Sequence, residues 1–302
     1  MYRLCYITIM QIILCIAFVG AAFGSHYEIP ERTEDNIIIA SYNIHQFGQA
    51  DHDIEKLAKV IKYFDVCGIL EVKEEAEVAR LAAALKSETG KEWGYVYGAM
   101  THRPRDIYYE AYAAVWRKDR ARLGDGVISN IQDLNDKYKH DPFLVSFKRM
   151  NFDFTLLLVH IRPADDADGT KAEEVRSLVD LLRSLRGYLP ERDIIMAGTF
   201  YYSGTDKVLI TMAEDADLIR IDPNAKTTIG KTYYTEYSES YDHIFISELD
   251  TTEFMKGQSK ALDAAKLIYG LKSKADMKKA EKELSDHIPV WATFDVSTPD
   301  DD

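Results

Sequence analysis

Short apolar runs along the chain alternate with segments in which apolar residues recur at helical spacing. Residues 37–42 and 66–70 are the first two runs, and their almost unbroken apolar character predicts buried strands. The same pattern predicts strands at 95–99, 110–117, 143–148, 153–161, 194–197, 243–246 and 290–294. Between residues 95 and 161 the runs follow one another at the spacing of hairpins.

Amphipathic helices are predicted between several of these strands. One follows the first strand, and a second ends at Gly90, because glycine readily adopts the left-handed conformation that closes a helix. A third begins at a capping box formed by Thr170 and Glu173, and the lysine-rich stretch 260–282 also has helical character. The apolar faces of the first three are Ile54, Leu57, Ile61 and Phe64; Val78, Leu81 and Leu85; and Val175, Leu178, Leu182 and Leu185. Mixed strands with interspersed helices predict an α/β sandwich whose loops gather at one rim.

The first 24 residues have the features of an export signal. Arg3 gives a positive start, residues 7–18 are almost all apolar, and Ala22-Phe23-Gly24 resembles a cleavage site. An uncleaved N-terminal anchor is the alternative, although the apolar stretch is short for a membrane span. We therefore expect a secreted or periplasmic protein that is not inserted in a membrane once the signal is removed.

The remaining residues contain no linker, repeat or low-complexity segment, which predicts one domain. We place a lead at residues 25–35, the domain at 36–296 and an acidic, disordered tail at 297–302. We also expect a monomer.

Charge and cysteine content narrow the chemistry. The formal net charge of −13 excludes a simple electrostatic trap for nucleic acid, so a phosphodiester substrate requires a local basic patch and a divalent cation. Of three cysteines, Cys5 and Cys15 lie in the predicted signal. Cys67 lies within an apolar strand, where we expect a buried, unreactive thiol and no intrachain disulfide.

Polar residues begin, end or interrupt many of the predicted strands, where a rigid sheet can hold a site. They are Asn43, Glu71, Glu110, His160, Asp242, His243, Asp286 and His287. Phosphodiester hydrolysis needs a cation to neutralise developing charge and groups that move protons. Carboxylates such as Glu71 and Asp286 suit Mg²⁺. Glu110 is a candidate partner for His160, and Asp242 for His287. Each residue alone has a plain alternative, such as a core histidine, a helix cap or a turn.

Four short fragments are specific in combination, although each is modest alone. They are Ile39-Ala40-Ser41-Tyr42-Asn43-Ile44, Ile69-Leu70-Glu71-Val72, Tyr241-Asp242-His243-Ile244 and Ser285-Asp286-His287-Ile288-Pro289-Val290. With them the chain resembles the endonuclease/exonuclease/phosphatase superfamily, and within it the deoxyribonuclease I-like branch with its secreted bacterial members. The supporting residues are Arg105, Tyr108, Glu110 and Tyr112, and the triplet Tyr269-Gly270-Leu271. The resemblance extends from Asn36 to Phe294 and implies a four-layer α/β sandwich, two packed mixed β-sheets flanked by helices.

The resemblance also implies roles for individual residues. Asn43, Glu71 and Asp286 are expected around Mg²⁺ or Mn²⁺. His160 and His287 are expected to be the catalytic imidazoles, paired with Glu110 and Asp242 respectively. Lys73, Arg105 and Tyr108 match positions that contact the DNA backbone and minor groove, with an ordinary exposed hairpin as the alternative for the last two. A structural Ca²⁺ site is compatible with the resemblance.

One segment departs from the family pattern. Gly198-Thr199-Phe200-Tyr201 stands where the family has Gly-Asp-Phe-Asn, so a metal-site carboxylate and a phosphate-binding amide are replaced. Losing one preorganised donor costs about 10²–10³ in rate. Three interpretations remain: a slow nuclease, a pseudoenzyme that binds without catalysis, or recruitment of Asp206 to the vacant position.

The sequence therefore predicts an exported, divalent-metal-dependent phosphodiesterase that cleaves DNA by in-line attack of water and leaves a 5′-phosphate. The alternatives are a non-catalytic binding protein and another enzyme of the superfamily, such as a sphingomyelinase or a phosphoinositide phosphatase. Arg105 and Tyr108 favour DNA, and no exposed apolar loop suited to membrane docking is evident in the sequence.

Overall fold

We describe the fold from a computed structural model that covers residues 26–100, 109–133, 135–161, 169–222, 224–232, 234, 236–270 and 273–300. The predicted export signal and the start of the lead lie outside the described residues, as do Arg105 and Tyr108. Among the helices of these ranges, none is long and apolar enough to cross a membrane.

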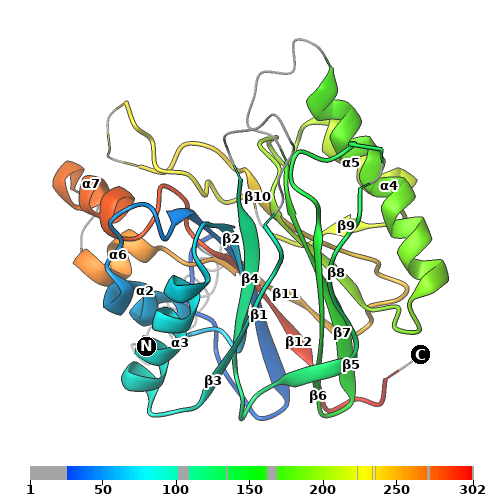
Figure 1. The fold of residues 1–302 in the computed structure, drawn as a ribbon, viewed down its shortest axis with the longest axis horizontal. Helices are drawn as coiled ribbons and strands as arrows, with labels where there is room; N and C mark the ends of the chain where they lie inside the picture. The colour runs from blue at the N-terminus through cyan, green and yellow to red at the C-terminus, as the bar shows by residue number, and fades with distance from the viewer. Residues whose placement is uncertain are drawn as a thin grey trace, which may run out of the picture.

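Two six-stranded mixed sheets form the centre of the molecule (Figure 1). The first sheet has the order β11 (Phe254–Ala261), β12 (Val290–Asp295), β1 (Asn36–Phe47), β2 (Val66–Val72), β4 (Ala111–Arg117) and β3 (Trp93–Tyr97). The second has the order β5 (Arg122–Asn130), β6 (Phe143–Arg149), β7 (Phe152–His160), β8 (Ile194–Thr199), β10 (Asp242–Ile246) and β9 (Ile219–Arg220). Only the neighbours β1/β2 and β7/β8 run parallel among the pairs of these strands.

Helices cover the outer face of each sheet, as Figure 1 shows. On the side of the first sheet lie α2 (Ile54–Ile61), α3 (Glu75–Thr89), α6 (Ala264–Tyr269) and α7 (Lys274–Glu283). On the side of the second lie α4 (Thr170–Tyr188) and α5 (Lys207–Asp215). The order helix, sheet, sheet, helix confirms the predicted four-layer α/β sandwich.

The apolar core holds the two sheets together and is fully buried. Aromatic side chains from both sheets meet in it, and the rings of Trp116 on β4 and Phe147 on β6 pack edge to face at 5.4 Å. Gly68 on β2 lies directly against Leu158 on β7, at a place where a β-carbon would come within 2.4 Å of the leucine side chain. This close packing fixes the relative positions of the strand ends that carry polar residues.

The parallel pairs place those strand ends at one edge of the sandwich, the upper edge in Figure 1. In the first sheet, β1 carries Asn43 near its end and β2 ends just after Glu71. In the second sheet, His160 and Thr199 are the last residues of β7 and β8 and pair with each other. The same register that buries the strands therefore brings chemically active side chains of both sheets together.

Several predicted details are wrong. The helix expected to begin with a capping box at Thr170 has Gly169, at φ 74°, as its N-cap residue and no side-chain cap there. A capping box is found instead at the start of α7, between Ser273 and Asp276. The lysine-rich stretch is not one helix, because Lys260 lies in β11 and α6 ends at Gly270. The strands β5, β9 and β11 and the helix α5 were not predicted.

Candidate active site

The first catalytic candidate is a buried pair at the end of β7. The Nδ1 atom of His160 makes a short hydrogen bond with Oε1 of Glu110, which directly precedes β4. Burial lowers the pKa of His160, but the charge of Glu110, its hydrogen bond and the charge of Glu71 together raise it above the ordinary value. The other ring nitrogen, Nε2, lies 3.6 Å from Oε1 of Glu71 and has no hydrogen-bond partner among the described residues. This nitrogen, although buried, is therefore the one that His160 can offer to a substrate.

The second candidate pair connects the last two polar fragments of the chain. Nδ1 of His287 and Oδ2 of Asp242 lie 2.8 Å apart, and both side chains are buried. Burial opposes protonation of His287, but the charge and hydrogen bond of Asp242, with smaller contributions from Asp286 and Glu71, raise its pKa to about 9. His287 is thus an imidazolium at neutral pH, held in place by a carboxylate.

A serine between these elements fixes the turn that carries His287. The hydroxyl of Ser285 donates to the backbone oxygen of Asn43 at 2.8 Å. It accepts in turn from the backbone N–H groups of His45 and His287, both at 3.1 Å. The turn before β12 is consequently tied to the end of β1, which brings Asp286 toward Glu71.

Three oxygen-bearing side chains form the candidate metal centre. Glu71 adopts φ 60° at an irregularity in the β1/β2 pairing, and its carboxylate accepts from Asn43 Nδ2 at 3.0 Å and from the backbone of Gln46 at 3.1 Å. Oδ1 of Asn43 and Oδ1 of Asp286 are buried and lack hydrogen-bond partners within the described part of the chain. Unpartnered buried oxygens are costly, and they are the donor type that Mg²⁺ and Mn²⁺ prefer. The residues present therefore fit a hard divalent cation.

Two basic side chains that the sequence did not predict for the site lie near this centre. Nδ1 of His45 lies 3.3 Å from Glu71 Oε2 and 3.9 Å from Asp286 Oδ1. The ammonium of Lys231 lies 3.0 Å from Asp286 Oδ2. The hydrogen bond with Glu71 raises the pKa of His45, and burial only partly opposes this. His45 stands two residues after Asn43 and could have been found from that spacing, whereas nothing in the sequence marks Lys231.

Thr199 and Tyr201, the substituted positions, both have defined places. The Thr199 hydroxyl donates to Asp242 Oδ1 at 2.6 Å and accepts from Asn43 Nδ2 at 3.2 Å. Tyr201 has φ 53°, and its ring centre lies 5.7 Å from that of His160 and 6.2 Å from that of His287. The ring therefore occupies the space beside both imidazoles. Asp206 does not replace the missing carboxylate, because its side chain caps α5 through the N–H of Val208 at 2.9 Å.

Of the residues expected to contact DNA, the structure describes Lys73. Lys73 is buried, and its ammonium donates to the backbone oxygen of Tyr109 at 2.7 Å and lies 3.9 Å from Glu110 Oε2. The ammonium thus lies between the segment at Tyr109 and the Glu110 carboxylate, and its contact with DNA stays a prediction. Arg105 and Tyr108 lie outside the described residues, so their predicted contacts stay predictions.

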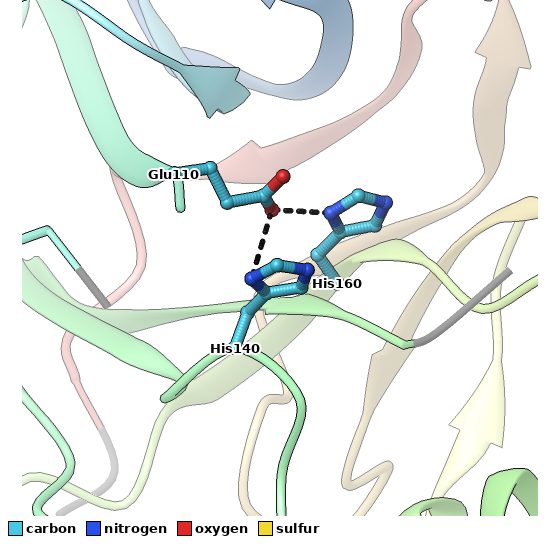
Figure 2. A group of neighbouring side chains, drawn as sticks. All are labelled: Glu110, His140 and His160. Atoms are coloured by element: carbon cyan, nitrogen blue, oxygen red, sulfur yellow. Dashed lines mark hydrogen bonds and ion pairs between the residues drawn. The ribbon is translucent and has the colours of Figure 1, made fainter. Parts of the chain in front are cut away.

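His140 is a further histidine of the site that sequence reasoning missed. Figure 2 shows His140 and His160 pointing toward the same Glu110 carboxylate, with His140 Nδ1 at 3.7 Å from Oε1. The two imidazole rings stack at 5.1 Å between centres. Burial lowers the pKa of His140 to about 4, so this ring is neutral at ordinary pH. It precedes β6, so the strand-end criterion that selected the other residues could have included it.

His243, by contrast, is a core residue. Its Nδ1 lies 3.1 Å from Asp222 Oδ2 and its Nε2 lies 2.9 Å from the backbone oxygen of Tyr202. The core-histidine alternative therefore holds for His243, whereas Asp242 faces the site, and the two residues begin β10 rather than form a turn.

Two imidazoles, each oriented by a carboxylate, thus flank a set of hard oxygen ligands at the rim of a two-sheet sandwich. This is the architecture of endonuclease/exonuclease/phosphatase proteins, and comparison with solved structures confirms the fold. An endonuclease/exonuclease/phosphatase family protein from Bacteroides thetaiotaomicron aligns with a TM-score of 0.58 at 16% identity, over 89% of this chain and 98% of that one. TDP2 from D. rerio, complexed with a single-strand DNA product, aligns with a TM-score of 0.56 at 13% identity, over 86% and 99%.

The sequence itself is similar to a protein named deoxyribonuclease from Thioalkalivibrio sp. (strain K90mix). The two are 25% identical over 276 residues, which is 89% of this chain and 74% of the relative. No protein-family model matches the chain. The fold that the resemblance implies is thereby confirmed, and the chain is similar in sequence to a protein named deoxyribonuclease.

Proposed function

We propose that the protein is a divalent-metal-dependent phosphodiesterase that hydrolyses DNA and is exported through its first 24 residues. The observation that carries this proposal is the pair of dyads, His160 with Glu110 and His287 with Asp242, on either side of one carboxylate set. The similarity to a protein named deoxyribonuclease supports DNA as the substrate class.

Asn43, Glu71 and Asp286 would hold the cation. When bound, it would supply positive charge to offset the negative charge that develops on the phosphate. The remaining chemistry belongs to the protein. An imidazole takes a proton from the attacking water, an imidazolium gives a proton to the departing 3′ oxygen, and the bond between phosphorus and that oxygen breaks to leave a 5′-phosphate. His160 and His287 share these duties, and the carboxylates at their Nδ1 atoms keep Nε2 directed at the substrate.

A second candidate function is binding without catalysis. The observation that favours it is the Tyr201 ring, which fills the space beside both imidazoles, together with the loss of a carboxylate at Thr199. In this case the protein would bind nucleic acid at this surface but would not hydrolyse it.

Nicking of supercoiled plasmid by the purified protein separates these functions. We expect nicking with Mg²⁺ or Mn²⁺ that disappears in EDTA and in His160→Ala. His26→Ala is the matched control, because His26 is exposed and is not a residue of the candidate active site. Activity equal in His160→Ala and the unmodified protein, at high protein concentration, would refute catalysis and favour the binding function.

A further inference from the structure

A second cluster of acidic side chains lies at the opposite end of the second sheet. Asp193 directly precedes β8, Glu253 directly precedes β11, and Asp300 belongs to the C-terminal segment. Ligand oxygens of the three lie within 4.8 Å of one another. Because Thr199 ends the same strand that Asp193 precedes, about six residues at ~3.3 Å each separate this acidic cluster from the candidate active site by roughly 20 Å. The two sites are therefore distinct.

The Asp193 carboxylate is the least compensated group of the acidic cluster. Asp193 is 0% exposed, and neither of its carboxylate oxygens has a hydrogen-bond partner among the residues that the structure describes. Its backbone is held on both sides, since its N–H donates to Glu191 Oε1 at 2.6 Å and its carbonyl accepts from Thr155 N–H at 2.8 Å. The backbone of Asp193 is thus fixed in place, with its carboxylate buried.

The surroundings of Asp193 further disfavour the ionised form of its carboxyl group. Burial and then the charges of Glu253, Glu191 and Asp300 raise its pKa to about 9, and the nearby Thr251 opposes this only in part. The Thr251 hydroxyl is itself buried and, in the described ranges, has no hydrogen-bond partner. A buried carboxylate among other carboxylates is strongly unfavourable unless a proton or a cation compensates it.

We propose that Asp193, Glu253 and Asp300 bind a calcium ion, with the Thr251 hydroxyl as a further oxygen ligand. Calcium accepts six to eight oxygens at about 2.3–2.6 Å, so two oxygens on one ion can lie up to about 5 Å apart, as they do here. Magnesium holds its ligands at about 2.0–2.1 Å and retains several waters, which suits a cluster of protein oxygens less well. The acidic cluster contains no nitrogen or sulfur ligand that would favour zinc.

The ion would fasten the C-terminal segment to the sheet. Residues 297–300, which the sequence led us to expect as disordered, are hydrogen-bonded in the structure. The Asn151 side chain donates to the Ser297 carbonyl at 2.9 Å, and the Asp153 N–H donates to Asp300 Oδ2 at 3.4 Å. The lower edge of the molecule in Figure 1 shows this segment beside the turn between β6 and β7. Calcium would add a strong link between that segment and β8.

Thermal unfolding in EDTA, CaCl₂ and MgCl₂ tests the calcium site directly and does not depend on the proposed function. At a calcium concentration 100-fold above Kd, we expect Tm to rise by about 5–10 °C in the unmodified protein. Asp193→Asn should abolish this shift and raise Tm in EDTA, because it removes a buried carboxyl that must take up a proton on folding. Glu253→Gln should also weaken the shift and provides a second variant should the first fail to fold. Asp180→Asn, on the exposed face of α4, is the matched control and should retain the full shift.

Two results would overturn the calcium site. A shift that survives Asp193→Asn but disappears in Glu71→Gln would place calcium at the candidate active site instead. An unmodified protein whose Tm ignores calcium, together with a more stable Asp193→Asn variant in EDTA, would mean that a proton alone compensates the acidic cluster. A calcium shift in a protein that never nicks DNA would refute the proposed function and leave the calcium site standing.

Discussion

Tyr201→Asn is the substitution with the largest expected gain in activity. Tyr201 holds a left-handed backbone at φ 53°, a conformation in which asparagine is several-fold enriched over bulky residues. The change relieves about 1 kcal/mol of backbone cost. It also removes ring contacts with His160, His287 and Tyr241, each worth about 0.5–1.5 kcal/mol. We therefore expect a net loss of about 0.5–3.5 kcal/mol in the free energy of unfolding.

The gain in rate has two sources. Removing the ring opens the space beside Nε2 of His160, which the structure leaves without a partner in its described residues. The new amide can also donate to a phosphate oxygen, and one such preorganised donor is worth about 10²–10³ in rate. The expected result is plasmid nicking accelerated by about two orders of magnitude in Mg²⁺.

Single-turnover nicking by the unmodified protein, Tyr201→Asn and Tyr201→Phe distinguishes the role of the ring from that of the hydroxyl. Burial, then the charge of Glu71, raises the pKa of the Tyr201 hydroxyl, which therefore remains a hydrogen-bond donor. Phenylalanine keeps the ring and should leave the rate near that of the unmodified protein. The reasoning is refuted if Tyr201→Asn gives no gain while Tyr201→Phe loses tenfold or more, because the tyrosine hydroxyl would then be the working donor.

Three further substitutions test other parts of the site. Thr199→Asp replaces a hydroxyl that lies 2.6 Å from Asp242 with a like charge, so urea unfolding in EDTA should show a loss of about 3 kcal/mol that MgCl₂ largely restores. Equal losses with and without MgCl₂ would argue against a metal at this position. His140→Gln should flatten the acid side of the stability profile. The folded pKa of about 4 lies below the unfolded value, so His140 contributes stability that is present above about pH 6.5 and is lost as pH falls toward 4, by about 1 kcal/mol per pH unit. Urea unfolding at pH 5 and pH 7 measures the difference, and identical profiles for both proteins would contradict the assigned pKa. His287→Ala should slow nicking by about 10²–10⁴ without unfolding the protein, as circular dichroism would check, and an unchanged rate would remove this imidazole from the reaction.

The fold was predictable because most strands are continuous apolar runs buried on both faces. The strand β5 shows the limit of this signal: its residues from Arg122 to Asn130 are largely exposed or half-buried at a sheet edge, so no apolar run marks it. The capping box predicted at Thr170 is wrong because the sequence pattern does not fix the exact start of the helix. The N-cap is Gly169, which has no side chain, so Thr170 is already the first helical residue, and spacing alone cannot show which of the two is the N-cap.

The site was predictable only where the family resemblance fixed long-range partners. Asp242 reaches His287 because the register of β10 and β8 sets Asp242 opposite Thr199, which no local pattern reveals. Lys231 arrives at Asp286 from a loop for the same kind of reason. The burial of Lys73 follows from its contacts with the segment at Tyr109 and Glu110, whereas the sequence shows only a basic residue after a strand.

The Thr199 hydroxyl joins the two halves of the molecule without help from any ion. Asn43 comes from one sheet and Asp242 from the other, and a single neutral group satisfies both. We therefore expect the rim of the sandwich to close on folding without a cation. An aspartate in that place would make assembly of the rim depend on the ionic composition of the compartment in which the protein is synthesised.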